Sequence, residues 1–281
     1  MTGTGIIGLL LIAINVVVSY KGFNNHFFFD KYKFEVEKIL LYKDYKRLVT
    51  SGFLHVNWTH LIFNMISLLM FSGLLESYGG GFEFLLIYVA GLVGGDLLSL
   101  LIHKHDPDYS SVGASGAVCG LIFAAIALFP GFNMGLFFIP ISIPGWLFGL
   151  LFVGFSMYGI KSRRDNVGYE AHLGGALVGM AVALLLHPSA FLLNYPAILV
   201  IAVPTIVFIY LIVTRPHLLL IDNYFFKTHR EHYSIDHKYN EAKHVQQKEI
   251  DRILDKINSR GMSSLSKKER EDLDRYSRAS R

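Results

Sequence analysis

The chain has 281 residues, of which 52% are hydrophobic and 17% are charged, with a formal net charge of +4. This composition is too apolar for an ordinary soluble domain and is typical of a protein that crosses a membrane several times. The excess of positive charge lies in residues 215–281, which hold 15 Lys and Arg against 11 Asp and Glu. No aromatic-lined groove accompanies these charges, so we expect no nucleic-acid partner. The single cysteine, Cys119, excludes an internal disulfide.

Seven apolar runs of about 17–22 residues are long enough for helices that cross the hydrocarbon core of a bilayer. The first run follows no basic residue and ends in no small-x-small cleavage site, so we interpret it as a span and not as a cleaved signal peptide. The fold class that follows is an all-α membrane protein. The predicted spans are 4–20, 58–77, 82–102, 114–130, 145–161, 171–187 and 194–214.

The connections between the predicted spans differ in length and polarity. In residues 21–57, apolar residues recur at roughly helical spacing, which predicts short amphipathic helices at the membrane interface. Residues 78–81 are long enough only for a tight link. Ser266 and Glu269 have the spacing of a capping box, and the sequence predicts a short helical hairpin in the charged, soluble tail. Docking of a regulatory partner is the alternative role for this tail.

Three polar sites stand at the starts of predicted spans, and two crossings separate each site from the next. They are His60 with Asn64 in HLIFN, Ser115 in GASG, and His172 in AHLGG. Two crossings return the chain to the same face, so all three sites approach the bilayer from one side and at a similar depth. A serine and a histidine that meet there, with further hydrogen-bond donors, are the groups that acyl transfer needs.

Ser115 is the candidate nucleophile of this group. Its position at a helix start is useful because the first backbone N–H groups of a helix have no partner within the helix and can face a developing oxyanion. Gly113 and Gly116 on either side allow a peptide backbone to approach closely. The alternative is that Ser115 only caps the helix.

His172 is the candidate general base, since a neutral imidazole titrates near pH 7. The alternative is a histidine that snorkels to the membrane surface or lines a pore. Small residues spaced four apart favour close packing of the helices that carry the two side chains, and such packing would bring Ser115 and His172 together. These residues are Gly116 and Gly120 in one span and Ala171, Gly175 and Gly179 in the other. Because Glu170 should point elsewhere, we expect a dyad and not a triad.

His60 and Asn64 are four residues apart and therefore share one face of a helix, about 6 Å apart along its axis. Imidazole and amide groups are typical oxyanion donors. An interhelical hydrogen bond that holds the bundle together is the alternative role. Asp96 lies inside the third predicted span, where a carboxylate costs a few kcal/mol unless it is paired or hydrated, about 2.5–3.5 on insertion scales. We predict a structural or water-retaining role for Asp96, with catalysis as the alternative.

Together these residues resemble the rhomboid family of intramembrane serine proteases. The resemblance covers about residues 40–187 and rests on YKRLVTSGFLHVNWTHLIFNM, SVGASGAVCGL and EAHLGGALVG, together with Glu76 and Gly79. It implies a six-span catalytic bundle over residues 1–190. One additional C-terminal span would occupy 191–214, and a charged soluble tail would occupy 215–281.

The resemblance also implies the roles of individual residues. Ser115 would be the nucleophile and His172 the general base, while His60, Asn64 and the backbone N–H of Ser115 would form the oxyanion hole. Arg47 would order the first loop. Gly113, Gly116 and Gly175 would be structural residues near the site.

The chain departs from the family pattern at two positions. The family usually has an aromatic residue just before the arginine, where this chain has Lys46. Some members have a tyrosine stacked on the histidine, where this chain has Cys119. Another group must therefore hold the imidazole.

The implied partners are the lipid bilayer and single-pass transmembrane proteins as substrates, and no cofactor or metal is expected. Connections on the Ser115 face contain 11 Lys and Arg, namely seven in 21–57, one in 103–113 and three in 161–170. Connections on the opposite face contain none. The positive-inside rule therefore predicts that the site faces the cytoplasm of a plasma or inner membrane, although the family usually opens the site away from the cytoplasm.

Three other function classes remain as alternatives. A catalytically silent relative that binds membrane helices would usually lack the serine or the histidine. A transporter or channel should have polar residues at many depths, whereas these residues cluster at one level. A metal hydrolase would need a ligand pattern such as HExxH, which does not accompany the histidines near this face.

Overall fold

The structure, a computed structural model, describes residues 5–129, 131–136, 139–162 and 167–215, together with positions 253, 256, 257, 264–266 and 269 of the tail. The chain divides into two compact units, Met1–Phe226 and Lys227–Arg281. The first unit contains the candidate site.

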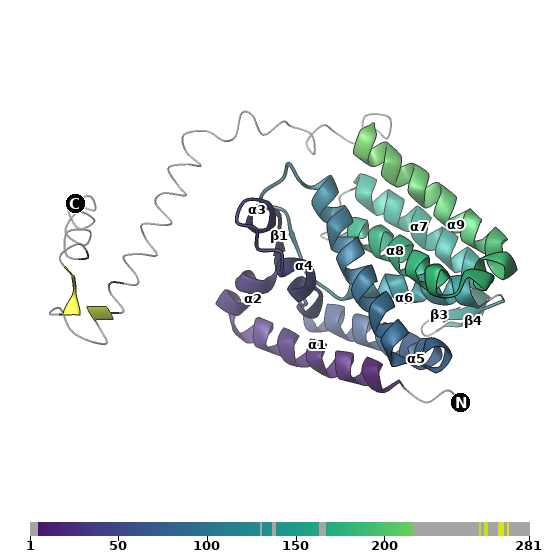
Figure 1. Ribbon diagram of the computed structural model, residues 1–281, viewed down its shortest axis with the longest axis horizontal. Helices are drawn as coiled ribbons and strands as arrows, with labels where there is room; N and C mark the ends of the chain where they lie inside the picture. Colours follow the sequence, from purple (N-terminus) through teal and green to yellow (C-terminus); the bar gives the residue numbers. More distant parts are fainter. Residues whose placement is uncertain are drawn as a thin grey trace. The chain divides into compact units, whose positions relative to one another are not determined.

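The described part of the first unit is mainly helical (Figure 1). Its helices are α1 (Ile6–Asn24), α2 (His26–Tyr32), α3 (Val36–Leu40), α4 (Arg47–Thr50), the 3-10 helix η1 (Ser51–Phe53), α5 (Trp58–Ile102), α6 (Ser115–Leu128), α7 (Gly145–Ser162), α8 (Tyr169–Leu186) and α9 (Pro188–Thr214). Two short antiparallel sheets pair β1 (Phe34–Glu35) with β2 (Ser110–Ser111) and β3 (Asn133–Leu136) with β4 (Ile139–Pro144).

The predicted all-α membrane bundle is confirmed. Each of the seven predicted spans overlaps helical residues among those that the structure describes, and the assignment of the last one as an added span stays a prediction. Among the described residues, α1, α5, α8 and α9 are long and apolar enough to cross a membrane, and α6 is a shorter apolar helix. The second and third predicted spans both lie in α5, which bends where Gly80 adopts φ 81° and ψ 169°. Only glycine adopts such backbone angles readily. The tight link predicted at residues 78–81 is therefore made at Gly80, the one residue inside α5 with non-helical angles.

The last helix begins earlier than expected. α9 starts at Pro188, and a proline suits the first turn of a helix because the N–H that it lacks would have no partner there. The helix then departs from helical geometry at Asn194. The side-chain amide of Asn194 donates a 2.6 Å hydrogen bond to the carbonyl oxygen of Ile126, which attaches α9 to the end of α6.

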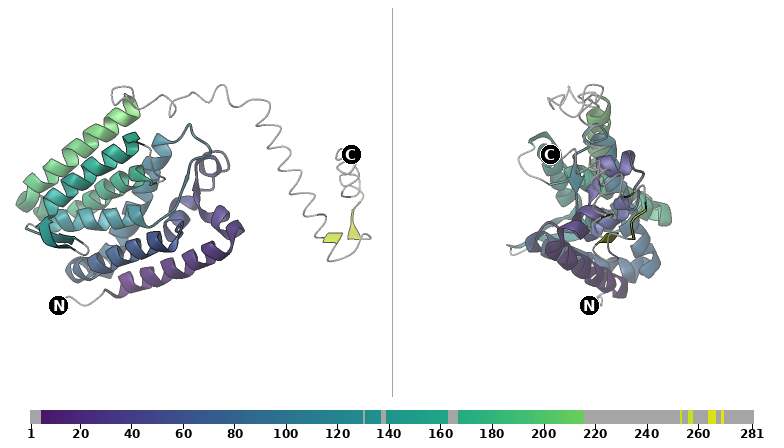
Figure 2. Two further views of the ribbon diagram at one scale, coloured as in Figure 1. Left: turned by 180° about the vertical axis from the view of Figure 1, so that it is seen from behind. Right: turned by 90° about the vertical axis from the view of Figure 1, so that its left-hand side faces the viewer.

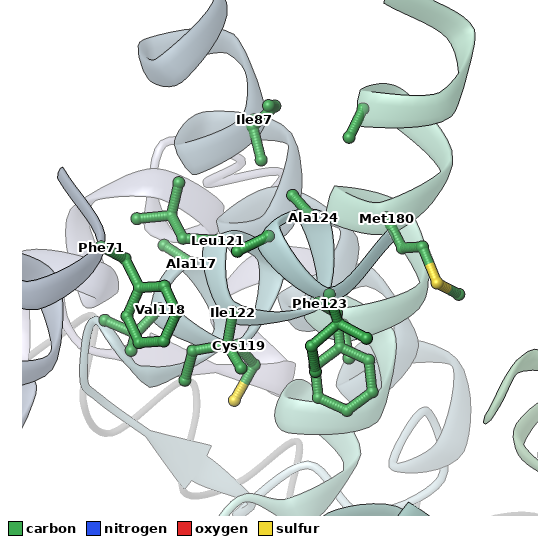
Figure 3. Packing of buried hydrophobic residues seen from close by; sticks show 14 of the residues in the cluster. Phe71, Ile87, Ala117, Val118, Cys119, Leu121, Ile122, Phe123, Ala124 and Met180 are labelled. Atoms are coloured by element: carbon green, nitrogen blue, oxygen red, sulfur yellow. The ribbon is translucent and has the colours of Figure 1, made fainter. Parts of the chain in front are cut away.

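Helix α6 is the centre of the bundle. It packs against α5 and α8, which also pack against each other, while α1 covers another part of α5 and α9 contacts α6, α7 and α8 (Figures 1 and 2). Every residue of α6 after Ser115 is buried. Its side chains meet Phe71 and Ile87 of α5 and Met180 of α8 in one hydrophobic cluster (Figure 3).

Glycines allow α6 and α8 to touch through their backbones. A Cβ atom added to Gly175 would lie within 2.1 Å of the carbonyl oxygen of Gly116, and one added to Gly179 would lie 2.3 Å from the Cα atom of Gly120. Backbone atoms cannot move aside as a flexible side chain can. The predicted close packing of these two helices at small residues is therefore present.

The first loop is organised around a buried arginine. The guanidinium of Arg47 donates hydrogen bonds to the carbonyl oxygens of Asp30 and Lys33, at 2.9 and 2.7 Å, and to the carboxylate of Asp44, at 3.0 Å. Burial is the largest single influence on the pKa of Asp44 and raises it. Hydrogen bonds from Arg47 and Lys46 together outweigh burial, so the pKa lies below its ordinary value. Arg47 thus joins α2 to the segment that precedes α4.

The second unit shows the two hydrogen bonds of a capping box. The backbone N–H of Ser266 donates to the carboxylate of Glu269 at 2.8 Å, and the N–H of Glu269 donates to the hydroxyl of Ser266 at 3.3 Å. Ile253 and Leu265 are buried against each other, with Ile257 beside them. Most of the predicted hairpin lies outside the described residues, so the division of the chain into catalytic bundle, added span and tail stays a prediction.

The contact between α6 and α8 can be tested with two glycine substitutions. We expect Gly175→Ala to destabilise the protein by about 1–3 kcal/mol, the usual cost of overpacking, because the new methyl group meets backbone of α6. Gly154→Ala on α7 is the matched control, since a Cβ atom there meets nothing within 4 Å. Thermal unfolding in detergent should show a lower Tm for the first variant alone. Equal Tm values for both variants would contradict the packing described here.

Candidate active site

Ser115 is the first residue of α6, and its hydroxyl is not the cap of that helix. The N-cap position is occupied by Ala114, which is preceded by Gly113 with φ +135°. The hydroxyl of Ser115 instead forms a hydrogen bond across the bundle, which removes the alternative role of helix cap. Ser115 itself is half-buried.

His172 lies in the first turn of α8, and its Nε2 atom is 2.8 Å from the Oγ atom of Ser115. The two residues are 57 positions apart in the chain, so only the packing of α6 against α8 brings them together. That packing includes the contact of Gly175 with Gly116. Gly116 directly follows Ser115, and Gly175 lies within one helical turn of His172. A serine hydroxyl hydrogen-bonded to an imidazole is the arrangement in which the imidazole can take the hydroxyl proton.

Two aromatic rings flank the imidazole of His172. The ring of Tyr169 is edge-on to it at a centroid distance of 5.8 Å, and the ring of Phe152 on α7 lies at 6.0 Å. Cys119, at the position where some relatives have a tyrosine, is buried in the core. Tyr169 and Phe152 therefore pack against the imidazole of His172, where some relatives use the tyrosine that this chain replaces by Cys119.

Glu170 pairs with a different histidine. Its carboxylate lies 3.3 Å from Nε2 of His103, and both side chains are buried. The ring of His103 is stacked on that of Tyr109 at 3.5 Å. Burial is the largest cause that raises the pKa of Tyr109, followed by the charges of Glu170 and Asp96. The carboxylate next to His172 in the sequence is thus directed to the connection between α5 and α6.

His60 and Asn64 lie on the side of α5 that approaches the Ser115 loop. The Cε1–Nε2 edge of the His60 ring lies against Gly113, where an added Cβ atom would be 2.7 Å from Cε1. Asn64 donates one amide hydrogen to the carbonyl oxygen of His60 at 2.9 Å. An asparagine amide has two hydrogens, so one remains for another acceptor. The structure therefore brings His60 to the candidate loop and leaves Asn64 one turn farther along α5.

Residues that the sequence analysis did not select fix the backbone in front of Ser115. The N–H of Gly113 donates to the carbonyl oxygen of Ser51 at 3.1 Å, and the N–H of Ala114 donates to Nε2 of His55 at 3.4 Å. The hydroxyl of Ser51 donates to the carboxylate of Asp96 at 2.8 Å. The buried Asp96 therefore has a hydrogen-bonded partner. The spacing of HVNWTH gives no signal of these contacts, because the partners are backbone groups far away in the sequence.

The site contains no metal-binding cluster within the part of the chain that the structure describes: no three His, Cys, Asp or Glu side chains converge there. The serine and the histidine are the groups with nucleophilic and basic chemistry. Acyl transfer is the reaction that this pair can support.

Comparisons with known proteins give one family over the part of the chain that contains these residues. A Rhomboid domain matches residues 42–189, and a family of unknown function matches residues 233–279 of the tail. RHOMBOID-like protein 12, mitochondrial, of Arabidopsis thaliana is 30% identical over 62% of this chain and 55% of its own length. Rhomboid protein 1, mitochondrial, of Saccharomyces cerevisiae is 31% identical over 53% of this chain and 45% of its own length. Rhomboid protease GluP of Bacillus subtilis is 31% identical over 49% of this chain and 25% of its own length.

The residues that match the Rhomboid domain, 42–189, include Ser115 and His172. The chain spans about half the length of the first two relatives named above. One of the three is named a protease.

The buried His55 makes the stability of the fold depend on pH. Burial, and then the charge of His60, lower the pKa of His55 to about 3, from an ordinary value of 6.5. Between these two values the unfolded chain binds a proton that the folded chain does not, so stability falls as the pH is lowered from 6.5 towards 3. The expected slope is at most about 1.4 kcal/mol per pH unit. Thermal unfolding between pH 7 and 4.5 should show a larger loss of Tm for the wild type than for His55→Gln. Parallel losses would contradict this assignment.

Proposed function

Because the chain belongs to the rhomboid family, as its match over residues 42–189 establishes, we propose that it is an endopeptidase that cleaves transmembrane segments through a Ser115–His172 dyad. The observation that carries this proposal is the 2.8 Å contact between Oγ of Ser115 and Nε2 of His172. The same contact argues against the catalytically silent alternative, because both reactive groups are present and joined.

In the proposed reaction, Nε2 of His172 takes the hydroxyl proton while Oγ of Ser115 attacks the carbonyl carbon of the scissile bond. The imidazolium then gives this proton to the leaving nitrogen as the C–N bond breaks, which leaves an ester on Ser115. A water molecule attacks the ester with the imidazole again as base. The product acid leaves, and the proton returns to Oγ.

The oxyanion that forms in each step needs donors beside Oγ. We assign this role to the backbone N–H of Ser115 at the start of α6, the free amide hydrogen of Asn64, and the imidazole of His60. Each well-placed donor is worth about 3–4 kcal/mol of transition-state stabilisation. The contact of His60 with Gly113 supports its assignment, since Gly113 is two residues from the nucleophile.

The short length of α6 supports a reaction inside the bilayer. Its 14 residues extend about 21 Å, whereas the hydrocarbon core is about 30 Å thick. If the far end of α6 reaches the opposite surface, Ser115 lies below the near one. A substrate helix must unwind there, because the peptide bonds of an intact helix are already hydrogen-bonded. We therefore propose single-pass transmembrane proteins as the substrate class.

The protein is an integral membrane protein, and we propose that its site faces the cytoplasm of a plasma or inner membrane. The 11 Lys and Arg in connections on the Ser115 face, against none on the opposite face, support this orientation. The names of two relatives state a mitochondrial location for those proteins. If α9 is an added span, as we propose, the number of crossings predicts that the charged tail is on the same side of the membrane as the site.

Cleavage of a model transmembrane substrate in detergent tests the proposed activity. Ser115→Ala and His172→Ala should each lower kcat by about 10³-fold or more, because the two side chains act as a unit. Ser67→Ala is the matched control, since that hydroxyl donates to the carbonyl oxygen of Phe63 in its own helix, and it should cleave at the wild-type rate. Equal cleavage by wild type and Ser115→Ala would exclude the serine mechanism. No cleavage by the wild type would favour a helix-binding relative.

A reporter fused to the C-terminus tests the orientation. A fusion that requires the cytoplasm for its activity should be active, because the tail and the positively charged connections share that side. Activity only of a reporter that works outside the cytoplasm would overturn the proposed orientation, and it would leave the dyad untouched.

A further inference from the structure

We propose that His55 is a positioning residue for the nucleophile: it holds the backbone immediately before Ser115 through a hydrogen bond that only one neutral form of its ring can make. This inference rests on the proposed function. His55 is completely buried in the loop between η1 and α5, and its ring contacts Ser19, His60 and the backbone of Ala114.

The backbone that carries Ser115 is held by two hydrogen bonds. Two consecutive N–H groups, those of Gly113 and Ala114, donate to acceptors in the segment 51–55. The acceptors are the carbonyl oxygen of Ser51 and Nε2 of His55, at 3.1 and 3.4 Å. Because Gly113 has φ +135°, this loop has a conformation that ordinary residues rarely adopt. The two hydrogen bonds keep it in the one arrangement that directs Oγ of Ser115 to His172.

The hydrogen bonds of the His55 ring determine which of its nitrogens carries the proton. A backbone N–H can only donate, so Nε2 must carry a lone pair towards Ala114. The single hydrogen of the neutral ring is then on Nδ1, which lies 2.9 Å from the hydroxyl of Ser19 on α1. Ser19 in turn donates to the carbonyl oxygen of Phe53 at 3.0 Å. Each hydrogen in this series of hydrogen bonds has one acceptor. If the ring were protonated, Nε2 would carry a hydrogen that points at the N–H of Ala114, and this hydrogen bond would be lost.

The ring of His55 also contacts His60, the candidate oxyanion donor. The rings of His55 and His60 meet edge to face with centroids 4.9 Å apart. His60 lies directly against Gly113. A single buried imidazole thus contacts both the backbone before the nucleophile and the ring proposed to bind the oxyanion.

Ser51, whose carbonyl oxygen accepts from Gly113, is itself held by two contacts. The hydroxyl of Ser51 is 2.6 Å from the carbonyl oxygen of Arg47 and 2.8 Å from the carboxylate of Asp96. Asp96 therefore fixes the residue whose carbonyl accepts from Gly113. This arrangement gives Asp96 the structural role predicted from the sequence, because Asp96 contacts Ser51 and Ser51 accepts a hydrogen bond from the loop before Ser115.

Two amide substitutions separate the functions of the two ring nitrogens. In His55→Gln the amide oxygen can take the place of Nε2 and accept from Ala114, whereas in His55→Asn the shorter amide can reach only the Nδ1 position near Ser19. We expect kcat on a transmembrane substrate at pH 7 to fall about tenfold or more in His55→Asn. The kcat of His55→Gln should stay within about threefold of the wild type. KM should change less than twofold in both, because the substrate contacts are unaltered.

His187→Ala is the control for a general loss of stability. Its imidazole pairs with Glu83 at 2.7 Å, beyond the last turn of α8 and away from the candidate site. This variant should lose Tm without a change in kcat. Equal kcat in wild type and His55→Asn, or a loss of kcat that follows Tm across all three variants, would overturn the positioning role. An inactive wild-type protein would instead contradict the proposed function itself.

Discussion

The backbone contact between α6 and α8 is the constraint on which the candidate site depends. Where Gly175 and Gly179 of α8 meet Gly116 and Gly120 of α6, no side chain separates the two helices. Ser115 and His172 each stand within one turn of this contact, so the distance between them follows from the distance between the helix axes. Interhelical packing in a membrane gains little from the hydrophobic effect, and close van der Waals contact at small residues takes its place. The reactive pair is therefore a consequence of how tightly the core of the bundle packs.

A second set of interactions determines the direction of the serine side chain. The connection before α5 contributes Ser51 and His55, whose acceptors hold the loop that ends at Ser115. Within this connection, the hydroxyl of Ser51 lies between the carbonyl oxygen of Arg47 and the carboxylate of Asp96. Buried polar groups are costly unless they are hydrogen-bonded, so each of these residues both needs and supplies a partner. The glycine contact sets the distance between the reactive groups, and this polar network sets their orientation.

The sequence predicted the parts of the fold that depend on local pattern or on side-chain chemistry. Apolar runs predicted where the helices lie. Because two predicted crossings separate Ser115 from His172, the sequence also predicted that both residues lie on the same side of the membrane and at a similar depth. Features that depend on distant backbone groups had no local signal. The hydrogen bonds to His55 and Ser51, the pairing of Glu170 with His103 and the bond from Asn194 to Ile126 belong to this class. The β3–β4 hairpin was also not expected, because its prolines and short strands lack the usual alternation. The early start of α9 had a signal in Pro188 that the boundary at 194 overlooked.

The rate at which a fluorophosphonate labels Ser115 is the most direct test of the link between helix packing and the reactive pair. Phosphonylation needs a hydroxyl activated by its neighbouring base, and intact-protein mass spectrometry reports one adduct per reactive serine. The account predicts a single adduct on Ser115 in the wild type and in Gly154→Ala at the same rate. In Gly175→Ala, compared at a temperature where the protein is folded, the rate should fall by about tenfold or more, since displacements of about 1 Å can cost 10²-fold. Labelling of Gly175→Ala at the wild-type rate, or an adduct on a serine other than Ser115, would contradict it.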